Sequence, residues 1–325
     1  MTLAVSSAPI ISVVTPFYNS DDTLDRCISN VLSQSGADFE YVLADNCSND
    51  KSADIARHHA QRDSRIRYLR FEDHLPKTRN YNRALRMITD VSRYCKIVQA
   101  DDFLYPGCLE QMLALALQNP SAGIVGARRV VGDLIDPPPA KILSPVSSGR
   151  ERCRQFLRGE LYPFGSPTSV MYRADLVRGL RSEFFDGRMY FDDVDVVLNL
   201  LRTTDFAFCD QVLTFTQRDS TSTFGKVMQY FPSLLNHYVM LRRWGADFFS
   251  AEELNPLLDV IARQYYEALL RAARRTDRVA LFRFHHTVLA GAGFRWEWRR
   301  MCATFATMTG GWLCRRGRAI LRRGF

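Results

Sequence analysis

Four short polar segments of the sequence hold the side chains that are best suited to chemistry. In chain order they are residues 15–19 (TPFYN), 45–50 (DNCSND), 99–102 (QADD) and 191–195 (FDDVD). Neighbouring carboxylates such as Asp101 and Asp102 repel each other unless cations or hydrogen-bond donors compensate them. Hard divalent cations such as Mg²⁺ and Mn²⁺ prefer carboxylate oxygens and are often shared with substrate phosphates. The acidic segments therefore indicate a metal site that binds a phosphorylated ligand.

Each segment taken alone also has a structural explanation. Proline and asparagine in the first are typical of a strand-to-helix turn. In the second, Ser48 or Asn49 would cap a helix whose first turn contains Asp50. Asp45 is not needed for this cap, and a carboxylate there is able to accept a hydrogen bond from a ring N–H of a nucleobase. In the fourth segment the helix dipole explains one acid better than three, which leaves a candidate general base.

The elements that would position these segments alternate between strands and helices. Strands are predicted at residues 10–15, 39–44, 66–71, 95–100 and 122–127, with helices at about 51–62, 77–89 and 106–118. This alternation predicts an α/β fold with a Rossmann-like, mostly parallel sheet flanked by helices on both faces. Ligands of such sheets bind beyond the carboxyl ends of the strands, where the first three polar segments lie.

The second half of the sequence has fewer strand signals. Residues 133–148 are rich in proline and serine and predict an irregular loop. A helix is expected near residues 193–203, and short strands at 207–209 and 212–216. From residue 225 onward the pattern is helical without a clear strand, which predicts a C-terminal helical extension.

The positive charge of the chain is concentrated at its C-terminal end. The formal net charge is +8, but the thirteen arginines and two acids from Arg271 to Phe325 give this stretch +11 and leave −3 for the rest. Such asymmetry indicates an anionic partner, such as a membrane surface, a lipid diphosphate or a nucleic acid. A solvated arginine-rich helical face explains the same pattern equally well.

Cysteine usage and hydropathy predict the compartment. The eight cysteines are scattered and form no CxxC pair, which argues against a zinc site or a disulfide framework. No run of eighteen apolar residues occurs, and the first ten residues lack the features of a secretory signal. We therefore expect a cytoplasmic protein, located at the inner face of the membrane if the basic end contacts lipid.

Read in order, these segments resemble family 2 glycosyltransferases of the GT-A fold. The motifs that carry the resemblance are VVTPFYN, YVLADNCSNDKS, LPKTRNYNRAL, KIVQADDFLYPGCLEQM, SPTSVMYR and FFDGRMYFDDVDVVLNLL. The match spans about residues 9–220 with motif order and spacing intact, which single motifs by chance would not give. The resemblance implies a GT-A catalytic domain at 1–224, with a nucleotide-sugar half at about 9–127 and an acceptor half at about 149–220, followed by an arginine-rich helical extension at 225–325.

The resemblance also implies a role for individual residues. The base-and-ribose pocket would be lined by Thr15, Pro16, Tyr18 and Asp45, while Arg79 or Lys77 would reach the base or diphosphate and Asp101 and Asp102 would be the metal and ribose acids. Asp193 falls at the position of the catalytic base, and its neighbour Asp192 is the rival. Residues 165–168 (GSPT) would shape the acceptor side, although a loop entering a strand explains them equally well.

Two positions depart from the family pattern. Many relatives carry an acid where this chain has Gln99, so the metal would rest on Asp101 and Asp102. Relatives often show R-x-H after the final strand, whereas this chain has Gln217-Arg218-Asp219. Asp219 either replaces that histidine, or the contact is lost.

The resemblance implies an inverting transferase that moves a sugar from a nucleotide-diphosphate donor, with a preference for UDP, to a hydroxyl of a glycan or lipid-linked acceptor. Mn²⁺ or Mg²⁺ would be the cofactor, with peripheral membrane contact through the Arg/Trp-rich C-terminus and no nucleic acid as partner. The alternatives are a catalytically inactive nucleotide-sugar-binding protein and, less favoured, a nucleotidyltransferase. The latter usually has a glycine-rich basic loop near the first strand, and TPFYNSDD is acidic and lacks glycine. No GxxxxGK[ST] motif of a P-loop NTPase occurs.

Overall fold

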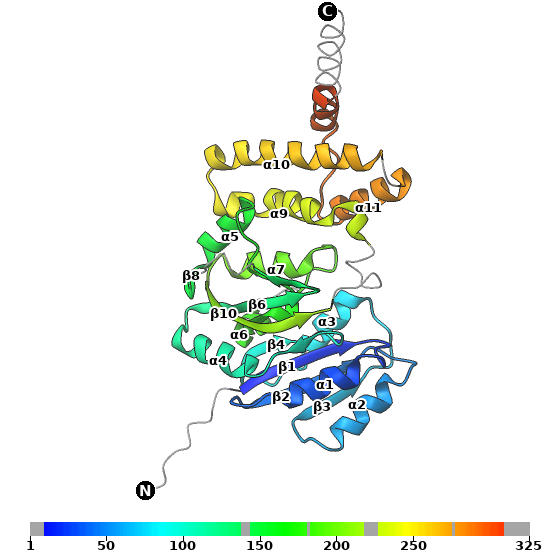
Figure 1. The fold of residues 1–325 in the computed structure, drawn as a ribbon, viewed down its shortest axis with the longest axis vertical. Helices are drawn as coiled ribbons and strands as arrows, with labels where there is room; N and C mark the ends of the chain where they lie inside the picture. The colour runs from blue at the N-terminus through cyan, green and yellow to red at the C-terminus, as the bar shows by residue number, and fades with distance from the viewer. Residues whose placement is uncertain (1–9, 138–143, 181–182, 218–226, 275–276, 309–325) are drawn as a thin grey trace, which may run out of the picture. The chain divides into compact units, whose positions relative to one another are not determined.

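A computed structural model describes residues 10–137, 144–180, 183–217, 227–274 and 277–308 of the chain (Figure 1). The chain divides into two compact units. The first, here called the sheet unit, comprises Met1–Gly187 and Asp192–Arg218. The second, the helical unit, comprises Arg188–Phe191 and Asp219–Phe325. Among the described residues, no helix is both long and apolar enough to cross a membrane.

The sheet unit contains a single sheet with strand order β3-β2-β1-β4-β9-β6-β10-β5. Its strands are β1 (Ile10–Phe17), β2 (Phe39–Asp45), β3 (Ile66–Arg70), β4 (Ser92–Ile97), β5 (Phe103–Leu104), β6 (Ala122–Val131), β7 (Leu134–Asp136), β8 (Val146–Ser148), β9 (Val170–Arg173) and β10 (Asp205–Thr216). The longest pairings, β1 with β2 and β10 with β6, are parallel. Strand β9 is antiparallel to both β4 and β6. The mostly parallel α/β sheet is confirmed.

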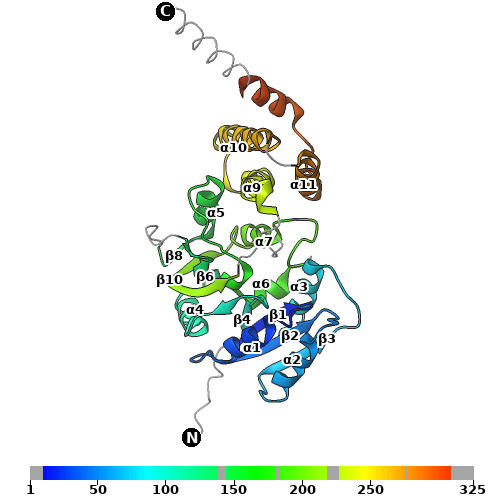
Figure 2. The same ribbon diagram turned by 45° about the vertical axis from the view of Figure 1, so that its right-hand side comes forward.

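Helices cover both faces of this sheet (Figure 2). They are α1 (Leu24–Leu32), α2 (Ser52–Ala60), α3 (Lys77–Leu85), α4 (Cys108–Gln118), α5 (Gly149–Leu157), α6 (Ala174–Gly179) and α7 (Asp192–Leu200), with a 3-10 turn η1 (Pro167–Ser169). Alternate residues of β1, Ile11 and Val13, pack into one apolar cluster with Leu24 of α1 and Leu109 of α4. The opposite face of the sheet is covered by α3, α6 and α7. The strand period of two thus divides the core into two layers.

Three local features differ from the sequence-based expectation. Strand β4 ends at Ile97 and not at residue 100, because the Asp102 N–H bonds back to the Gln99 carbonyl at 3.0 Å and closes a turn. Helix α2 begins at Ser52, so the polar residues before it form a longer turn than expected. The proline-rich stretch at 133–148 contains the short strands β7 and β8, which pair with β6 and β10.

The described part of the helical unit consists of η2 (Met228–Tyr230), α9 (Pro232–Phe248), α10 (Ala251–Ala272), α11 (Arg278–Gly291) and helical residues 298–308. Buried tyrosines form its core, with the rings of Tyr238 and Tyr265 stacked at 4.6 Å. The stretch Arg188–Phe191 packs within the same unit. A Cβ placed on Gly291 would lie 2.3 Å from the Arg188 carbonyl oxygen, and the Tyr190 ring packs edge-on against Phe284 at 5.2 Å.

Candidate active site

The turns that follow β1 and β2 are joined by hydrogen bonds at the carboxyl edge of the sheet. The Asn46 N–H bonds to the Phe17 carbonyl at 2.9 Å, and the Asn49 N–H bonds to the Asn19 side chain at 2.9 Å. The Ser20 N–H bonds to the Ser52 hydroxyl at 2.8 Å. These bonds bring the first two polar segments of the sequence together.

Asp45 ends strand β2 and is fully buried. Its Oδ1 accepts a hydrogen bond from the Ser48 N–H at 2.8 Å, and its Oδ2 accepts one from the Tyr68 hydroxyl at 2.9 Å. The Arg70 guanidinium lies 3.9 Å away. Asp45 thus holds the turn after β2, whereas the expected helix cap by Ser48 or Asn49 was wrong, because α2 begins at Ser52 and has no side-chain cap.

The other residues expected at the base pocket differ in accessibility. Thr15 and Pro16 are buried, and the Thr15 hydroxyl bonds to the Tyr41 hydroxyl at 2.9 Å. Tyr18 is 41 % exposed, and its ring lies 4.2 Å from the imidazole of His74. Sequence reasoning missed His74, which the order of the strands brings beside Tyr18. Together the two rings offer an aromatic surface for a nucleobase.

Asp101 and Asp102 lie in the turn after β4. Asp102 is 2 % exposed, and its Oδ1 accepts a hydrogen bond from the Gln217 N–H at 2.8 Å. Its Oδ2 is buried and has no hydrogen-bond partner among the described residues. Burial raises the pKa of Asp102 to about 7, and the negative charge of Asp101 adds to this, while the neighbouring Thr168 hydroxyl and the Gln217 N–H oppose the shift. A buried carboxylate with one oxygen left unpaired is a costly arrangement unless a ligand completes it.

The unpartnered Asp102 oxygen makes the turn after β4 a suitable site for a divalent cation. The unpaired oxygen of Asp102, with the half-buried carboxylate of Asp101 beside it, supplies hard oxygen ligands. Within the described ranges, no group of three His, Cys, Asp or Glu residues is arranged to hold a metal alone. Phosphate oxygens of a bound ligand would therefore have to complete the coordination. Asp219, the expected substitute for histidine, lies outside the described residues.

Asp192 and Asp193 open helix α7 and point to different partners. The Thr78 hydroxyl donates to Asp192 Oδ2 at 2.7 Å, whereas Asp193 Oδ1 accepts from the Val194 N–H at 2.9 Å. Burial and then repulsion by Asp193 raise the pKa of Asp192 to about 7. Burial also raises the pKa of Asp193, although the Val194 N–H and the charges of Lys77 and Arg129 oppose it. Both carboxyls are thus shifted toward the range in which a general base works.

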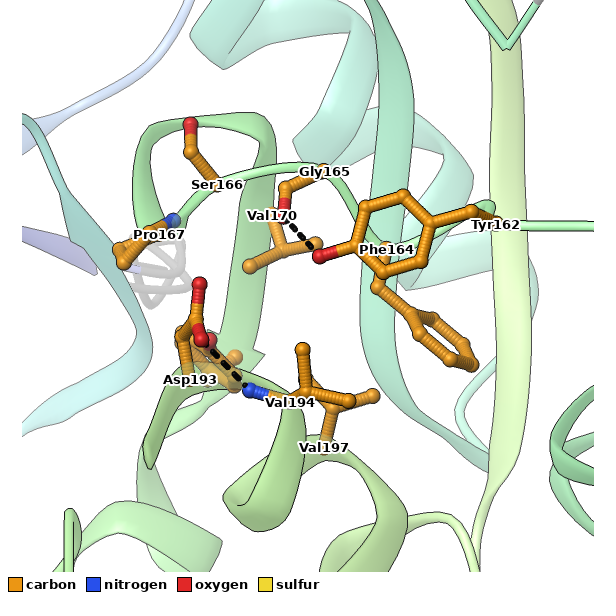
Figure 3. A pocket seen from close by; sticks show the side chains of 10 residues that line it. Tyr162, Phe164, Gly165, Ser166, Pro167, Val170, Asp193, Val194 and Val197 are labelled. Atoms are coloured by element: carbon orange, nitrogen blue, oxygen red, sulfur yellow. Dashed lines mark hydrogen bonds between the residues drawn. The ribbon is translucent and has the colours of Figure 1, made fainter. Parts of the chain in front are cut away.

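The carboxylate of Asp193 faces a small hollow between α7 and the turn that precedes η1 (Figure 3). The hollow is lined by Tyr162, Phe164, Gly165, Ser166, Pro167, Val170, Tyr172, Asp193, Val194 and Val197. Figure 3 shows the Asp193 carboxylate pointing toward Pro167 and the Tyr162 hydroxyl bonded to the Gly165 carbonyl, at 3.0 Å. The hollow is too tight to admit water as it stands. The segment expected on the acceptor side thus lies opposite Asp193.

Helix α3 places the positive charge of Lys77 near both aspartate pairs, Asp101–Asp102 and Asp192–Asp193. The pKa of Lys77 is raised first by Tyr81 and then by the negative charges of Asp192, Asp193 and Asp101. Of the two cations expected near the donor, Lys77 is therefore the one whose charge acts on the acids. Lys77 and Arg79 are both exposed to solvent on α3.

A buried lysine, Lys96, was not anticipated from the sequence. It lies next to the last residue of β4, is fully buried, and its ammonium donates to the carbonyls of Thr168 and Val170. The Thr168 hydroxyl in turn accepts the Gln99 N–H at 3.1 Å. Lys96 therefore fastens η1 to the strand that carries the acidic turn. A charged residue in an otherwise apolar strand, CKIV, was the available signal.

The candidate residues that the structure describes all belong to the sheet unit. Comparison with known proteins places that unit in context. The model of the family described as glycosyl transferase family 2 matches residues 12–181. An uncharacterised protein of Mycobacterium tuberculosis is 31% identical over 236 residues, which cover 68% of this chain and 70% of that protein. The putative teichuronic acid biosynthesis glycosyltransferase TuaG of Bacillus subtilis is 30% identical over 35% of this chain and 44% of its own length.

Solved structures with this fold are also similar. The S. aureus TarS fragment 1–349 matches with a TM-score of 0.62 and 14% identity, over 87% of this chain and 79% of that one. The mannosyltransferase PcManGT of Pyrobaculum calidifontis, in complex with GDP-Man and Mn²⁺, matches with a TM-score of 0.54 and 15% identity, over 92% of this chain and 85% of that one. These likenesses establish a GT-A type α/β fold.

Proposed function

This chain belongs to glycosyl transferase family 2 and is a glycosyltransferase, and from that premise we propose that it is an inverting transferase dependent on a divalent cation. The donor is a nucleotide-diphosphate sugar, and the acceptor is a hydroxyl of a glycan or a lipid-linked glycan. The proposal is supported most by one observation. Two carboxylates of the sheet unit are placed for different tasks: a buried oxygen of Asp102 has no hydrogen-bond partner among the described residues, whereas Asp193 faces a hollow.

The donor's nucleoside binds at the edge formed by the turns after β1 and β2. Tyr18 and His74 offer the base an aromatic face, and Asp45 offers it a carboxylate. Thr15 and Pro16 lie beneath and shape the floor of the pocket. TarS has been solved with UDP and with UDP-GlcNAc, and PcManGT with GDP-Man. We favour a UDP-sugar for this chain.

The diphosphate lies over the turn after β4, close to Lys77. Asp101 and Asp102 would hold Mn²⁺ or Mg²⁺, which would supply positive charge to stabilise the leaving diphosphate. Lys77 adds a positive charge near the same group, and Arg79, which like Lys77 is exposed on α3, is also available to the diphosphate. The chain's own contribution is therefore to orient the leaving group.

Asp193 is the proposed general base. It takes the proton of the acceptor hydroxyl as that oxygen attacks the anomeric carbon from the face opposite the diphosphate, which inverts the configuration. Asp192 is a poorer candidate, because the Thr78 hydroxyl holds it toward α3 and it does not line the hollow that Asp193 faces. Opening of the hollow around residues 165–167 is required for the acceptor to reach Asp193.

The test is donor binding and turnover across UDP-, GDP- and dTDP-sugars, with and without Mn²⁺. The control is the Asp101→Ala/Asp102→Ala double variant, with folding checked by circular dichroism. We expect a metal-dependent signal with one donor class, lost in the double variant. Tight donor binding without turnover on any acceptor would instead support the alternative function, an inactive nucleotide-sugar-binding protein.

We also propose that the C-terminal end of the chain contacts an anionic membrane surface. Helical residues 298–308 expose Trp298 by 60% and Phe305 by 50%, and Arg299 is exposed on the same short helix. Tryptophan beside arginine suits the interface between lipid headgroups and water. Cosedimentation with vesicles that contain phosphatidylglycerol, compared with purely zwitterionic ones, tests this contact. Equal binding of the Trp298→Ser/Phe305→Ser variant would contradict it.

A further inference from the structure

Helix α3 holds the segment that leads into α7 through its side chains. The Asn82 amide donates to the Phe185 carbonyl at 2.8 Å and accepts the Phe185 N–H at 2.8 Å, and it is itself buried. Four residues earlier, the Thr78 hydroxyl donates to Asp192 at 2.7 Å. Residues 78 and 82 lie on one face of the helix because they are one turn apart. One face of α3 therefore fixes the chain on both sides of residues 188–191.

The Thr78 hydroxyl bonds to only one of the two adjacent acids. Asp192 is turned toward α3 by this bond, whereas Asp193 accepts the Val194 N–H and faces the hollow. The charges that act on the pair are Lys77 from α3 and, on Asp193, Arg129 from β6. Without the hydroxyl, repulsion between the carboxylates would turn Asp192 away from Asp193 into whatever space is open.

We propose that Thr78 is a positioning residue, which holds Asp192 against α3 so that Asp193 alone faces the acceptor hydroxyl. This inference rests on the proposed function, in which Asp193 is the base. Thr78 stands between Lys77 and Arg79, the two cations assigned to the donor side. The same turn of α3 therefore serves the donor on one side and orders the base on the other. A bound donor that shifts this turn would shift the acid pair with it.

The pH dependence of turnover should report this role. Burial and the charge of Asp193 raise the pKa of Asp192 to about 7, and the Thr78 hydroxyl acts in the opposite direction. Loss of the hydroxyl raises this pKa further. The negative charge of an ionised Asp192 raises the proton affinity of Asp193, and this effect is lost when Asp192 is protonated. The two carboxyls titrate as a pair, so kcat is highest when both are ionised. The acid limb of the kcat profile should therefore move to higher pH when the hydroxyl is removed.

The experiment compares Thr78→Val, which keeps the shape and loses the donor, with Thr78→Ser, which keeps the donor. Thr287→Val is the matched control, because it removes an exposed hydroxyl that bonds only within α11, to the Arg283 carbonyl. We expect Thr78→Val to lower kcat roughly 10- to 100-fold, with little change in donor KM and with the acid limb shifted to higher pH. Thr78→Ser and Thr287→Val should resemble the wild type.

A double-mutant cycle with Asp192→Asn guards against a purely structural effect. If Thr78 acts through Asp192, Thr78→Val should have little further effect on kcat in the Asp192→Asn background. Fully additive losses would overturn the inference, as would identical kcat and pH profiles for Thr78→Val and Thr78→Ser. A wild-type protein that transfers no sugar from any donor would instead refute the proposed function itself, together with the inference that rests on it.

Discussion

The two aspartate pairs of the sheet unit, Asp101–Asp102 and Asp192–Asp193, are alike in sequence and different in their surroundings. Each pair contains one carboxyl whose pKa burial raises to about 7, Asp102 in the first and Asp192 in the second. At Asp102, one oxygen has no partner within the described part of the chain. At Asp192, a hydroxyl occupies an oxygen at 2.7 Å.

This difference shows how one residue type serves two kinds of chemistry. In the first aspartate pair, the buried Asp102 oxygen that has no partner among the described residues is suited to coordinate a cation. In the second pair, Asp192 accepts the Thr78 hydroxyl and Asp193 accepts the Val194 N–H. Asp193 also faces a hollow, which suits proton transfer from an incoming hydroxyl. Lys77 acts on both pairs and moderates the repulsion within each. We interpret the pairs as one metal-binding and one proton-accepting group, and three predictions separate them.

The largest effect is expected for the proton-accepting residue. Asp193→Asn keeps the shape of the side chain and removes its basicity, so kcat should fall about 1000-fold. Donor affinity and the Mn²⁺ concentration for half-maximal binding should be unchanged, because the metal pair is intact. Single-turnover kinetics and calorimetric titration with the donor measure the two quantities separately.

Asp175→Asn is the matched control for this variant. Asp175 is a surface acid of α6 that forms an ion pair with Arg173, and its replacement should leave kcat near the wild-type value. Retention of full activity in Asp193→Asn would show that the second pair is not the proton acceptor.

A smaller effect is expected on stability as a function of pH. In the unfolded chain each carboxyl ionises near pH 4, whereas Asp102 and Asp192 in the fold stay protonated up to about pH 7. Between pH 4 and 7 the folded state therefore binds more protons than the unfolded state. As the pH rises through this range, the free energy of unfolding of the metal-free protein should fall. Each residue contributes at most about 4 kcal/mol to this loss.

Mn²⁺ should separate the two contributions, since it binds the ionised form of only one pair. Urea unfolding at pH 4.5 to 8 measures this, in the wild type, Asp102→Asn and Asp192→Asn. Each variant should flatten the decline, but at pH 7.5 Mn²⁺ should stabilise the wild type and Asp192→Asn and leave Asp102→Asn unaffected. An equal response of Asp102→Asn to Mn²⁺ would place the cation elsewhere.

The smallest effect should come from a residue that belongs to neither pair. His74→Leu removes the ring that lies 4.2 Å from Tyr18, so the Kd for the free nucleoside diphosphate should rise about 5-fold. The dependence on Mn²⁺ and on pH should stay as in the wild type. A shift in either dependence would mean that the base pocket and the acid pairs are not independent. His58→Leu, on the exposed surface of α2, is the control.

The alternation of strands and helices made much of the sheet predictable, because burial and β-branched content mark each parallel strand locally. It also identified the ends of β2 and β4 as the places where polar residues gather. The antiparallel pairing of β9 with β4 and β6 was not foreseen, since it depends on contacts distant in sequence.

The hydrogen-bond partners of the side chains in the site could not be predicted from the sequence either, because they too are distant in sequence. No local pattern shows that Thr78 meets Asp192, 114 positions away, or that Lys96 reaches the carbonyl of Thr168. The motif order indicated which acids matter, but their orientation is decided by which elements pack against them. Our proposal that Asp193 and not Asp192 is the base therefore rests on contacts that only the fold supplies.

The stretch Arg188–Phe191 belongs to the helical unit, which restricts how this chain can be truncated or recombined with relatives. These four residues are flanked on both sides by the sheet unit, and they pack against α11 through Arg188 and Tyr190. The boundary between the units is therefore crossed three times by the backbone. Truncation after residue 218 would strip the packing from the stretch that immediately precedes Asp192. The C-terminal region is thus not a detachable appendage, and chimeras that exchange it must exchange residues 188–191 as well.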